Sequence, residues 1–143
     1  MAVDAGADAI LVSNHGGRQL DSAPSTASVL TGIVNAVGER TEVYVDSGIR
    51  SGLDVLKFLG LGARACFLGR AYLYGLGAYG QAGVTKALEI IRDELDIAMA
   101  LTGIIDASNV PREIILRPPP EPSRTATPSG DGPFQDVRAF EEI

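Results

Sequence analysis

The chain has 143 residues, of which 45% are apolar and 21% charged, and its formal net charge is −6 at pH 7. These values are typical of a globular chain with one sizeable core, and the acidic excess disfavours nucleic-acid binding through a broad basic face. Cys66 is the only cysteine, which excludes an internal disulfide and a cysteine-built metal site, and no apolar run approaches the roughly 20 residues of a transmembrane segment.

The chain alternates between short apolar runs and helical patterns. The apolar runs predict strands over residues 9–12, 43–45 and 65–68. The helical patterns lie over residues 26–37, 52–60 and 83–101. Short strands separated by helices pair in parallel with the helices outside, which predicts an α/β fold. Three such units leave a sheet with free edges, and an eight-unit barrel needs about 250 residues. We therefore expect a partial (β/α)8 TIM barrel, about its last three units plus C-terminal helices.

Capping residues mark the ends of the predicted helices. Ser25 or Thr26 begins the first helix. Ser51 begins the second, and Asp54 three residues later completes a variant of the capping box. The third helix ends at Gly103.

The composition changes at Pro118, where a run rich in proline begins. Proline, serine, threonine and glycine continue to Pro133, and such a segment cannot bury much apolar surface. We therefore expect one folded domain over residues 1–117 and a disordered tail over residues 118–143.

The segment of residues 13–21 follows the first strand and contains the only histidine, His15. Two glycines after it let the backbone approach a ligand closely, and loops at this end of parallel strands carry the chemistry of barrel enzymes. Imidazole can accept a proton near neutral pH, and the planar guanidinium of Arg18 matches a carboxylate. His15 and Arg18 are therefore the candidate base and substrate anchor. Asp21 either holds the loop or pairs with Arg18.

Glycine and arginine also follow the second and third predicted strands. The residues at these two strand ends are Asp46, Ser47, Gly48, Ile49 and Arg50, and then Gly69 and Arg70. Free backbone amides, the N-terminus of the helix that follows and a guanidinium together favour an anion. Because barrels often bind phosphate in the loops after their last two strands, we expect one shared phosphate site.

Residues 75–80 spell the dinucleotide fingerprint G-x-G-x-x-G. The fingerprint requires a strand immediately before it, and residues 69–74 intervene here. We therefore expect these glycines to serve close helix packing instead.

Two of these segments resemble a known family. Residues 13–21 resemble the active-site signature of the FMN-dependent α-hydroxy-acid dehydrogenases and oxidases, and residues 46–70 resemble their flavin-phosphate segment. Residues 80–84 and 98–103 resemble the closing helices of the family, so the resemblance covers about residues 3–109. Within the family, the chain is most similar to the bacterial L-lactate dehydrogenases. Other phosphate-binding barrels, such as inosine monophosphate dehydrogenase, have a turn similar to the second segment.

The resemblance implies FMN-dependent oxidation of an L-2-hydroxy acid, above all L-lactate, to the 2-oxo acid. His15 is then the base that takes a proton from the substrate, and Arg18 binds the substrate carboxylate. The residues implied to hold the ribityl and phosphate groups of FMN are Asp46, Ser47, Gly48, Ile49, Arg50, Gly69 and Arg70. No metal is implied. The expected location is the cytoplasm, with the inner face of the cell membrane as an alternative.

The family barrel has five further strands before the position of residue 9. They carry a lysine near the flavin, tyrosines that contact substrate and an aspartate that orients the histidine. We therefore expect a C-terminal part of such an enzyme that is inactive alone, and that forms a homo-oligomer or joins a missing N-terminal half. The alternative is a non-catalytic, phosphate-binding half-barrel that needs self-association or a partner chain.

Overall fold

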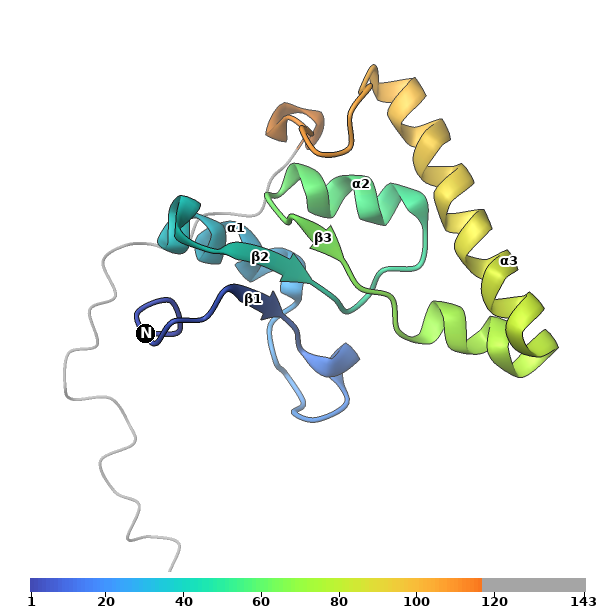
Figure 1. The fold of residues 1–143 in the computed structure, drawn as a ribbon, viewed down its shortest axis with the longest axis horizontal. Coiled ribbons are helices and arrows are strands. Elements are labelled where there is room, and N and C mark those ends of the chain that lie inside the picture. The colour runs from blue at the N-terminus through green and yellow to red at the C-terminus, as the bar shows by residue number, and fades with distance from the viewer. Residues whose placement is uncertain (117–143) are drawn as a thin grey trace, which may run out of the picture.

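A three-stranded parallel sheet lies at the centre of the computed structural model, which describes residues 1–116 (Figure 1). Its strands, in the order β1-β2-β3, are Ala9–Val12, Glu42–Val45 and Ala65–Cys66. Ile10 pairs with Val43, and Val45 pairs with Cys66 on its other side. The predicted α/β fold with parallel strands is confirmed. The third strand is two residues shorter than predicted, because β2 ends at Val45 and offers the residues after Phe67 no partner.

The first two helices begin, and the third ends, at the predicted capping residues. Their bounds are Thr26–Val37 (α1), Gly52–Gly60 (α2) and Arg70–Thr102 (α3), with short 3-10 turns at His15–Gly17, Gly38–Arg40 and Arg112–Ile114. The Ser25 hydroxyl accepts the amide hydrogen of Ser28 at 3.2 Å. Ser51 and Asp54 form the predicted capping box, and Gly103 ends α3 in the left-handed conformation. Each of these ends is set by chemistry within a few residues.

Helix α3 begins 13 residues earlier than predicted and contains a kink at Tyr79 and Gly80. The kink folds the first part of α3 back against the second, and their backbones meet at Gly75 and Gly83. A Cβ on Gly83 would lie 1.9 Å from the carbonyl oxygen of Gly75. The prediction that the glycines of residues 75–80 serve helix packing is confirmed for Gly75, whereas nothing among the described residues lies within 4 Å of a Cβ at Gly77 or Gly80. The prediction that this stretch precedes the helix is wrong, because glycines that permit close packing lowered its apparent helix propensity.

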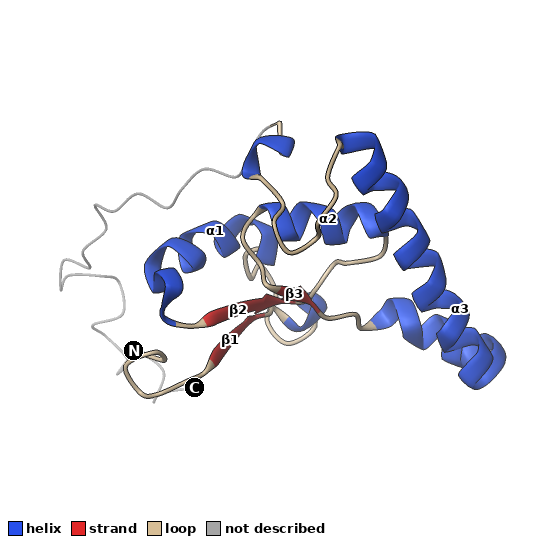
Figure 2. Ribbon diagram, turned by 45° about the horizontal axis from the view of Figure 1, so that its top comes forward, coloured by secondary structure: helices blue, strands red, loops and turns tan. Residues whose placement is uncertain are grey.

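The core lies between one face of the sheet and the helices α1 and α2, which cover that face in Figure 2. Its buried apolar residues are Val12, Leu30, Val37, Val43, Val45, Ile49, Phe58, Leu61 and Ala63. On the other face, Leu11 is 49% exposed and Phe67 is 50% exposed. Tyr44 lies between them in the strand order, and its ring centroid is 5.7 Å from that of Phe67. We call Leu11, Tyr44 and Phe67 the uncovered face.

Two leucines on the helices are about half-exposed. Leu53 on α2 and Leu88 on α3 are each 46% exposed, while Leu56 and Ile91 on the same helices are buried. Among residues 1–116, no helix has the length and apolarity that a membrane span requires. The predicted tail of residues 118–143 lies outside the described part of the chain.

The contact between Gly75 and Gly83 predicts an unusual response to alanine. Alanine in a helix normally adds up to about 1 kcal/mol of stability over glycine. Gly83→Ala should instead lower the free energy of unfolding by about 1–3 kcal/mol, because the new methyl group meets a backbone carbonyl. Gly77→Ala is the matched control, since nothing lies within 4 Å of a Cβ at Gly77. Urea unfolding of the full chain compares the two, and equal stabilisation by both would contradict the packing.

The Cys66 thiol is expected to react slowly with alkylating agents. Burial raises its pKa to about 12, whereas a free cysteine has a pKa of about 8.5. Only the thiolate is alkylated, so at pH 8 iodoacetamide should react roughly a thousandfold more slowly with Cys66 than with free cysteine. The rate should rise about tenfold per pH unit between pH 7 and 10. A rate that levels off near pH 9 would show that the thiol is not shielded.

Candidate active site

The loops after the strands meet at one edge of the sheet and enclose a cavity of about 380 Å³. Parallel pairing places the carboxyl ends of all three strands at this edge. The cavity is lined by every residue that the sequence predicted for the site: His15, Arg18, Asp46, Ser47, Gly48, Ile49, Arg50, Gly69 and Arg70. The candidate base, the candidate substrate anchor and the candidate phosphate loops thus share one space. We call it the strand-end cavity.

His15 lies in the loop after β1, where the 3-10 turn begins. Its φ is 53°, in the left-handed region that few residues with side chains adopt. The His15 amide donates to the Ser13 hydroxyl at 3.1 Å, and the Asn14 side chain accepts the Gly17 amide at 3.2 Å. The imidazole is exposed. Hydrogen bonds within the loop therefore fix its backbone, and His15 lines the strand-end cavity.

The loop after β2 is joined to the loop of His15 through Ser47. The Ser47 hydroxyl accepts the amide hydrogens of Gly16, at 3.1 Å, and of Asn14, at 3.4 Å. It donates to Oδ1 of Asp46 at 2.6 Å. Ser47 also has a left-handed backbone, with a φ of 72°. Hydrogen bonds within the protein therefore hold the two loops together, and they involve no ligand.

The strand-end cavity is positively charged although the chain as a whole is acidic. Arg18, Arg50 and Arg70 line it, together with the single carboxylate of Asp46. Within residues 1–116, none of the three guanidinium groups forms an ion pair. The pairing of Arg18 with Asp21 that the sequence left open is thus not formed. Unpaired guanidinium groups that converge in a cavity favour an anionic ligand.

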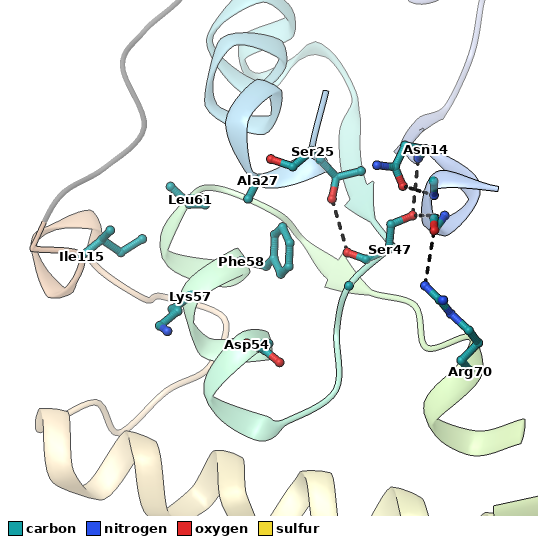
Figure 3. Close-up of a pocket in the computed structure, with 14 residues that line it drawn as sticks. Asn14, Ser25, Ala27, Ser47, Asp54, Lys57, Phe58, Leu61, Arg70 and Ile115 are labelled. Atoms are coloured by element: carbon teal, nitrogen blue, oxygen red, sulfur yellow. Dashed lines mark hydrogen bonds between the residues drawn. The ribbon is translucent and has the colours of Figure 1, made fainter. Parts of the chain in front are cut away.

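Arg70 links the end of the third strand to the loop of residues 13–17, which contains His15 and which we call the base loop. Its Nη2 donates to the carbonyl oxygen of Gly16 at 3.4 Å, and Figure 3 shows the side chain directed toward the loop that follows Asn14. A Cβ on Gly16 would lie 2.8 Å from this same nitrogen. Glycine at this position thus permits the close approach of Arg70, and the predicted close approach of a ligand to this loop stays a prediction.

The N-terminus of α3 lies at the cavity, and the expectation that the N-terminus of α2 serves the anion stays a prediction. Backbone amides just before α2 and at its first residue are bonded to carboxylates of the chain. Asp54 accepts the amide hydrogens of Arg50 and Ser51 at 3.0 and 3.1 Å, and Glu94 accepts that of Gly52 at 2.9 Å. Sequence reasoning missed Glu94 because it lies 42 residues away on another helix.

By contrast, the N-terminus of α3 carries neither a side-chain cap nor an acidic residue in its first turn. Gly69 and Arg70 begin this helix and also line the strand-end cavity. Nothing lies within 4 Å of a Cβ built at Gly69 or at Gly48, so both backbones face open space. Uncapped amides and the positive end of the helix dipole are suited to a phosphate.

A second cavity, of about 530 Å³, adjoins the first and is drawn in Figure 3. It runs from Ser47 and Arg70 between α1 and α2 toward Phe58 and Ile115. Gly16, Gly48, Ser47 and Arg70 line both cavities. The strand-end cavity therefore opens at one side into a more apolar groove.

Sequence reasoning missed several residues that shape the site. Thr26 is 3% exposed, and its hydroxyl donates to the carbonyl oxygens of Asp46, at 3.0 Å, and Ser47, at 3.4 Å. Phe67 and Leu73 line the strand-end cavity. The sequence indicates Thr26 only as a helix cap, and no local signal in it shows that Thr26 supports a loop twenty residues away. In the described part of the chain, no group of three or more histidine, cysteine, aspartate or glutamate residues could hold a metal ion.

Comparison with known proteins shows the family to which the chain belongs. The sequence profile described as FMN-dependent dehydrogenase matches residues 1–117. L-lactate dehydrogenase of Caulobacter vibrioides (strain NA1000 / CB15N) is 53% identical over 114 residues, which are 80% of this chain and 30% of that protein. L-lactate dehydrogenase of Alcaligenes faecalis is 50% identical over 118 residues, 82% of this chain and 31% of that protein. The chain thus spans about 30% of the length of these relatives.

Solved structures agree with the sequence comparison. A structure of mandelate oxidase with benzoyl-formic acid matches with a TM-score of 0.75 and 50% identity, over 78% of this chain and 33% of that one. A variant of mandelate oxidase with a monooxide FMN adduct matches equally well, with a TM-score of 0.75 and 50% identity over 78% of this chain and 35% of that one. The predicted family is confirmed, and the α/β fold with its parallel sheet is consistent with part of a barrel. The chain belongs to the family of FMN-dependent dehydrogenases, whose cofactor is FMN.

Proposed function

We propose that this chain forms the C-terminal part of a (β/α)8 barrel, its last three units and closing helices, in an enzyme that oxidises an L-2-hydroxy acid. L-lactate is the proposed substrate and its 2-oxo acid the product. The observation that carries the proposal is the strand-end cavity, which His15 and Arg18 line together with the loops proposed to bind phosphate. The L-lactate dehydrogenases among the relatives support the choice of substrate.

The proposed phosphate site fits the phosphate of FMN. Arg50 and Arg70 supply positive charge, and the uncapped N-terminus of α3 supplies amides. The group that would hold the ribityl and phosphate portions comprises Asp46, Ser47, Gly48, Ile49, Arg50, Gly69 and Arg70. FMN, when bound, would supply the acceptor for the two electrons that the substrate loses.

His15 and Arg18 would act on the substrate. In the oxidation of a 2-hydroxy acid, the hydroxyl proton and the C2 hydrogen leave, and a carbonyl forms. His15 would take the hydroxyl proton as a general base. Arg18 would hold the substrate carboxylate in a bidentate pair, which fixes the position of the hydroxyl relative to the base. Both side chains line the same cavity, as this division of roles requires.

The uncovered face explains why we expect little turnover from this chain alone. Leu11 and Phe67 are half-exposed there, although the paired strands would normally be covered on both faces. Strands β1 and β3 also have free edges in the three-stranded sheet. The same observation favours the second candidate, a phosphate-binding half-barrel that pairs with another copy or with a partner chain.

A hybrid enzyme tests the proposed function. In this hybrid, the matched segment of this chain replaces the corresponding 114 residues of the C. vibrioides L-lactate dehydrogenase. The hybrid should oxidise L-lactate with bound FMN at roughly 1–10³ per second, a rate typical of enzymes. The full chain alone should show no measurable oxidation. A hybrid that binds FMN but does not oxidise L-lactate would contradict the proposal.

Substitution of the proposed base makes the test specific. His15→Gln in the hybrid should lower kcat by about 10²–10⁴-fold, because the general base is lost. The bound flavin, measured by its absorbance, should stay at the same stoichiometry. Ser22→Ala is the control, since its exposed side chain does not line the strand-end cavity. Unchanged kcat in His15→Gln would exclude the proposed mechanism, because His15 would then not be the base.

A further inference from the structure

The Ser47 hydroxyl has no capacity left for a ligand. A serine hydroxyl offers one hydrogen to donate and two lone pairs to accept. The hydrogen goes to Asp46, and the lone pairs take the amide hydrogens of Gly16 and Asn14. The hydroxyl therefore serves the protein itself, although the residue lies in the loop proposed to hold the cofactor.

The hydroxyl is fixed from the core side. The Thr26 side chain, 3% exposed at the start of α1, donates to the carbonyl oxygens of Asp46 and Ser47. The Asp46 amide donates to the carbonyl oxygen of Val12 at 3.1 Å, which continues the pairing of β1 and β2. Ser47 is thus anchored to both the sheet and a helix, whereas the loop that it holds is exposed.

The two residues at this junction share a left-handed backbone. The φ of His15 is 53° and that of Ser47 is 72°. Residues with side chains keep such conformations only where their surroundings hold them there. For His15, the bonds from its neighbours Asn14 and Gly16 to Ser47 help to hold this conformation, and the bond from Arg70 to Gly16 adds to them.

We propose that Ser47 is the positioning residue for His15. Its hydroxyl would hold the base loop against the loop of residues 46–50, which is the loop proposed to bind phosphate. This inference rests on the proposed function. It changes the assignment of Ser47, whose side chain acts on the base loop and not on the cofactor. Removal of the hydroxyl should therefore leave the affinity for FMN unchanged and misplace His15.

Amide hydrogen exchange in the full chain tests whether the Ser47 hydroxyl holds the base loop, and it requires no enzymatic activity. In Ser47→Gly the Gly16 amide should exchange about tenfold faster, since a neutral hydrogen bond is lost. Ser47→Ala should have the same effect. Ser22→Gly is the matched control, because Ser22 also has a positive φ, of 62°, but its hydroxyl has no hydrogen bond among the described residues. Equal exchange of the Gly16 amide in Ser47→Gly and Ser22→Gly would overturn the proposal.

Kinetics of the hybrid enzyme test the consequence for His15. Ser47→Gly should lower kcat at least tenfold while the Kd for FMN stays within twofold. Deuterium at C2 of L-lactate should then slow the reaction more than in the unsubstituted hybrid, because hydrogen removal becomes more rate-limiting. A global loss of stability would not raise this isotope effect.

The outcomes separate the two proposals. A weaker Kd for FMN, with kcat restored at saturating FMN, would make Ser47 a cofactor ligand and overturn the inference. If the unsubstituted hybrid is inactive, the proposed function fails, and the exchange of the Gly16 amide alone decides whether Ser47 holds the loop.

Discussion

Parallel pairing of three strands in register is the constraint on which the site depends. It places the ends of β1, β2 and β3 at one edge, so that loops far apart in the sequence face one cavity. The pairing is itself supported by a core on one face only. The sheet that gathers the loops of the proposed active site also leaves Leu11 and Phe67 half-exposed on its other face.

Charge is distributed so that the cavity attracts an anion within an acidic chain. At the N-terminus of α2, the carboxylates of Asp54 and Glu94 accept the backbone amide hydrogens of Arg50 and Gly52. Among residues 1–116, the N-terminus of α3 has no such cap, and the three arginines beside it form no ion pair. An anion in the strand-end cavity therefore meets guanidinium groups and free amides at the third strand, while the second strand contributes its loop backbone and Arg50.

Local chemistry explains which features the sequence predicts well. The helix ends at Ser25, Ser51 and Gly103 depend on contacts within a few residues, and the apolar runs predict all three strands. The residues around the cavity are also predicted, because glycine and arginine recur after each buried run. The closure of α2 by Glu94 depends on packing between distant segments, and a linear pattern does not encode it. The bonds from Ser47 to the base loop are also long-range, spanning 31 and 33 residues.

The affinities of FMN and riboflavin for the full chain test the central claim most directly. The two flavins differ only in the phosphate, so their ratio measures the phosphate site that the strand-end cavity would provide. The account predicts that FMN binds at least tenfold more tightly than riboflavin, and that added salt reduces the difference as charges are screened. Equal affinities at low salt would contradict the assignment of the phosphate site to Arg50, Arg70 and the N-terminus of α3.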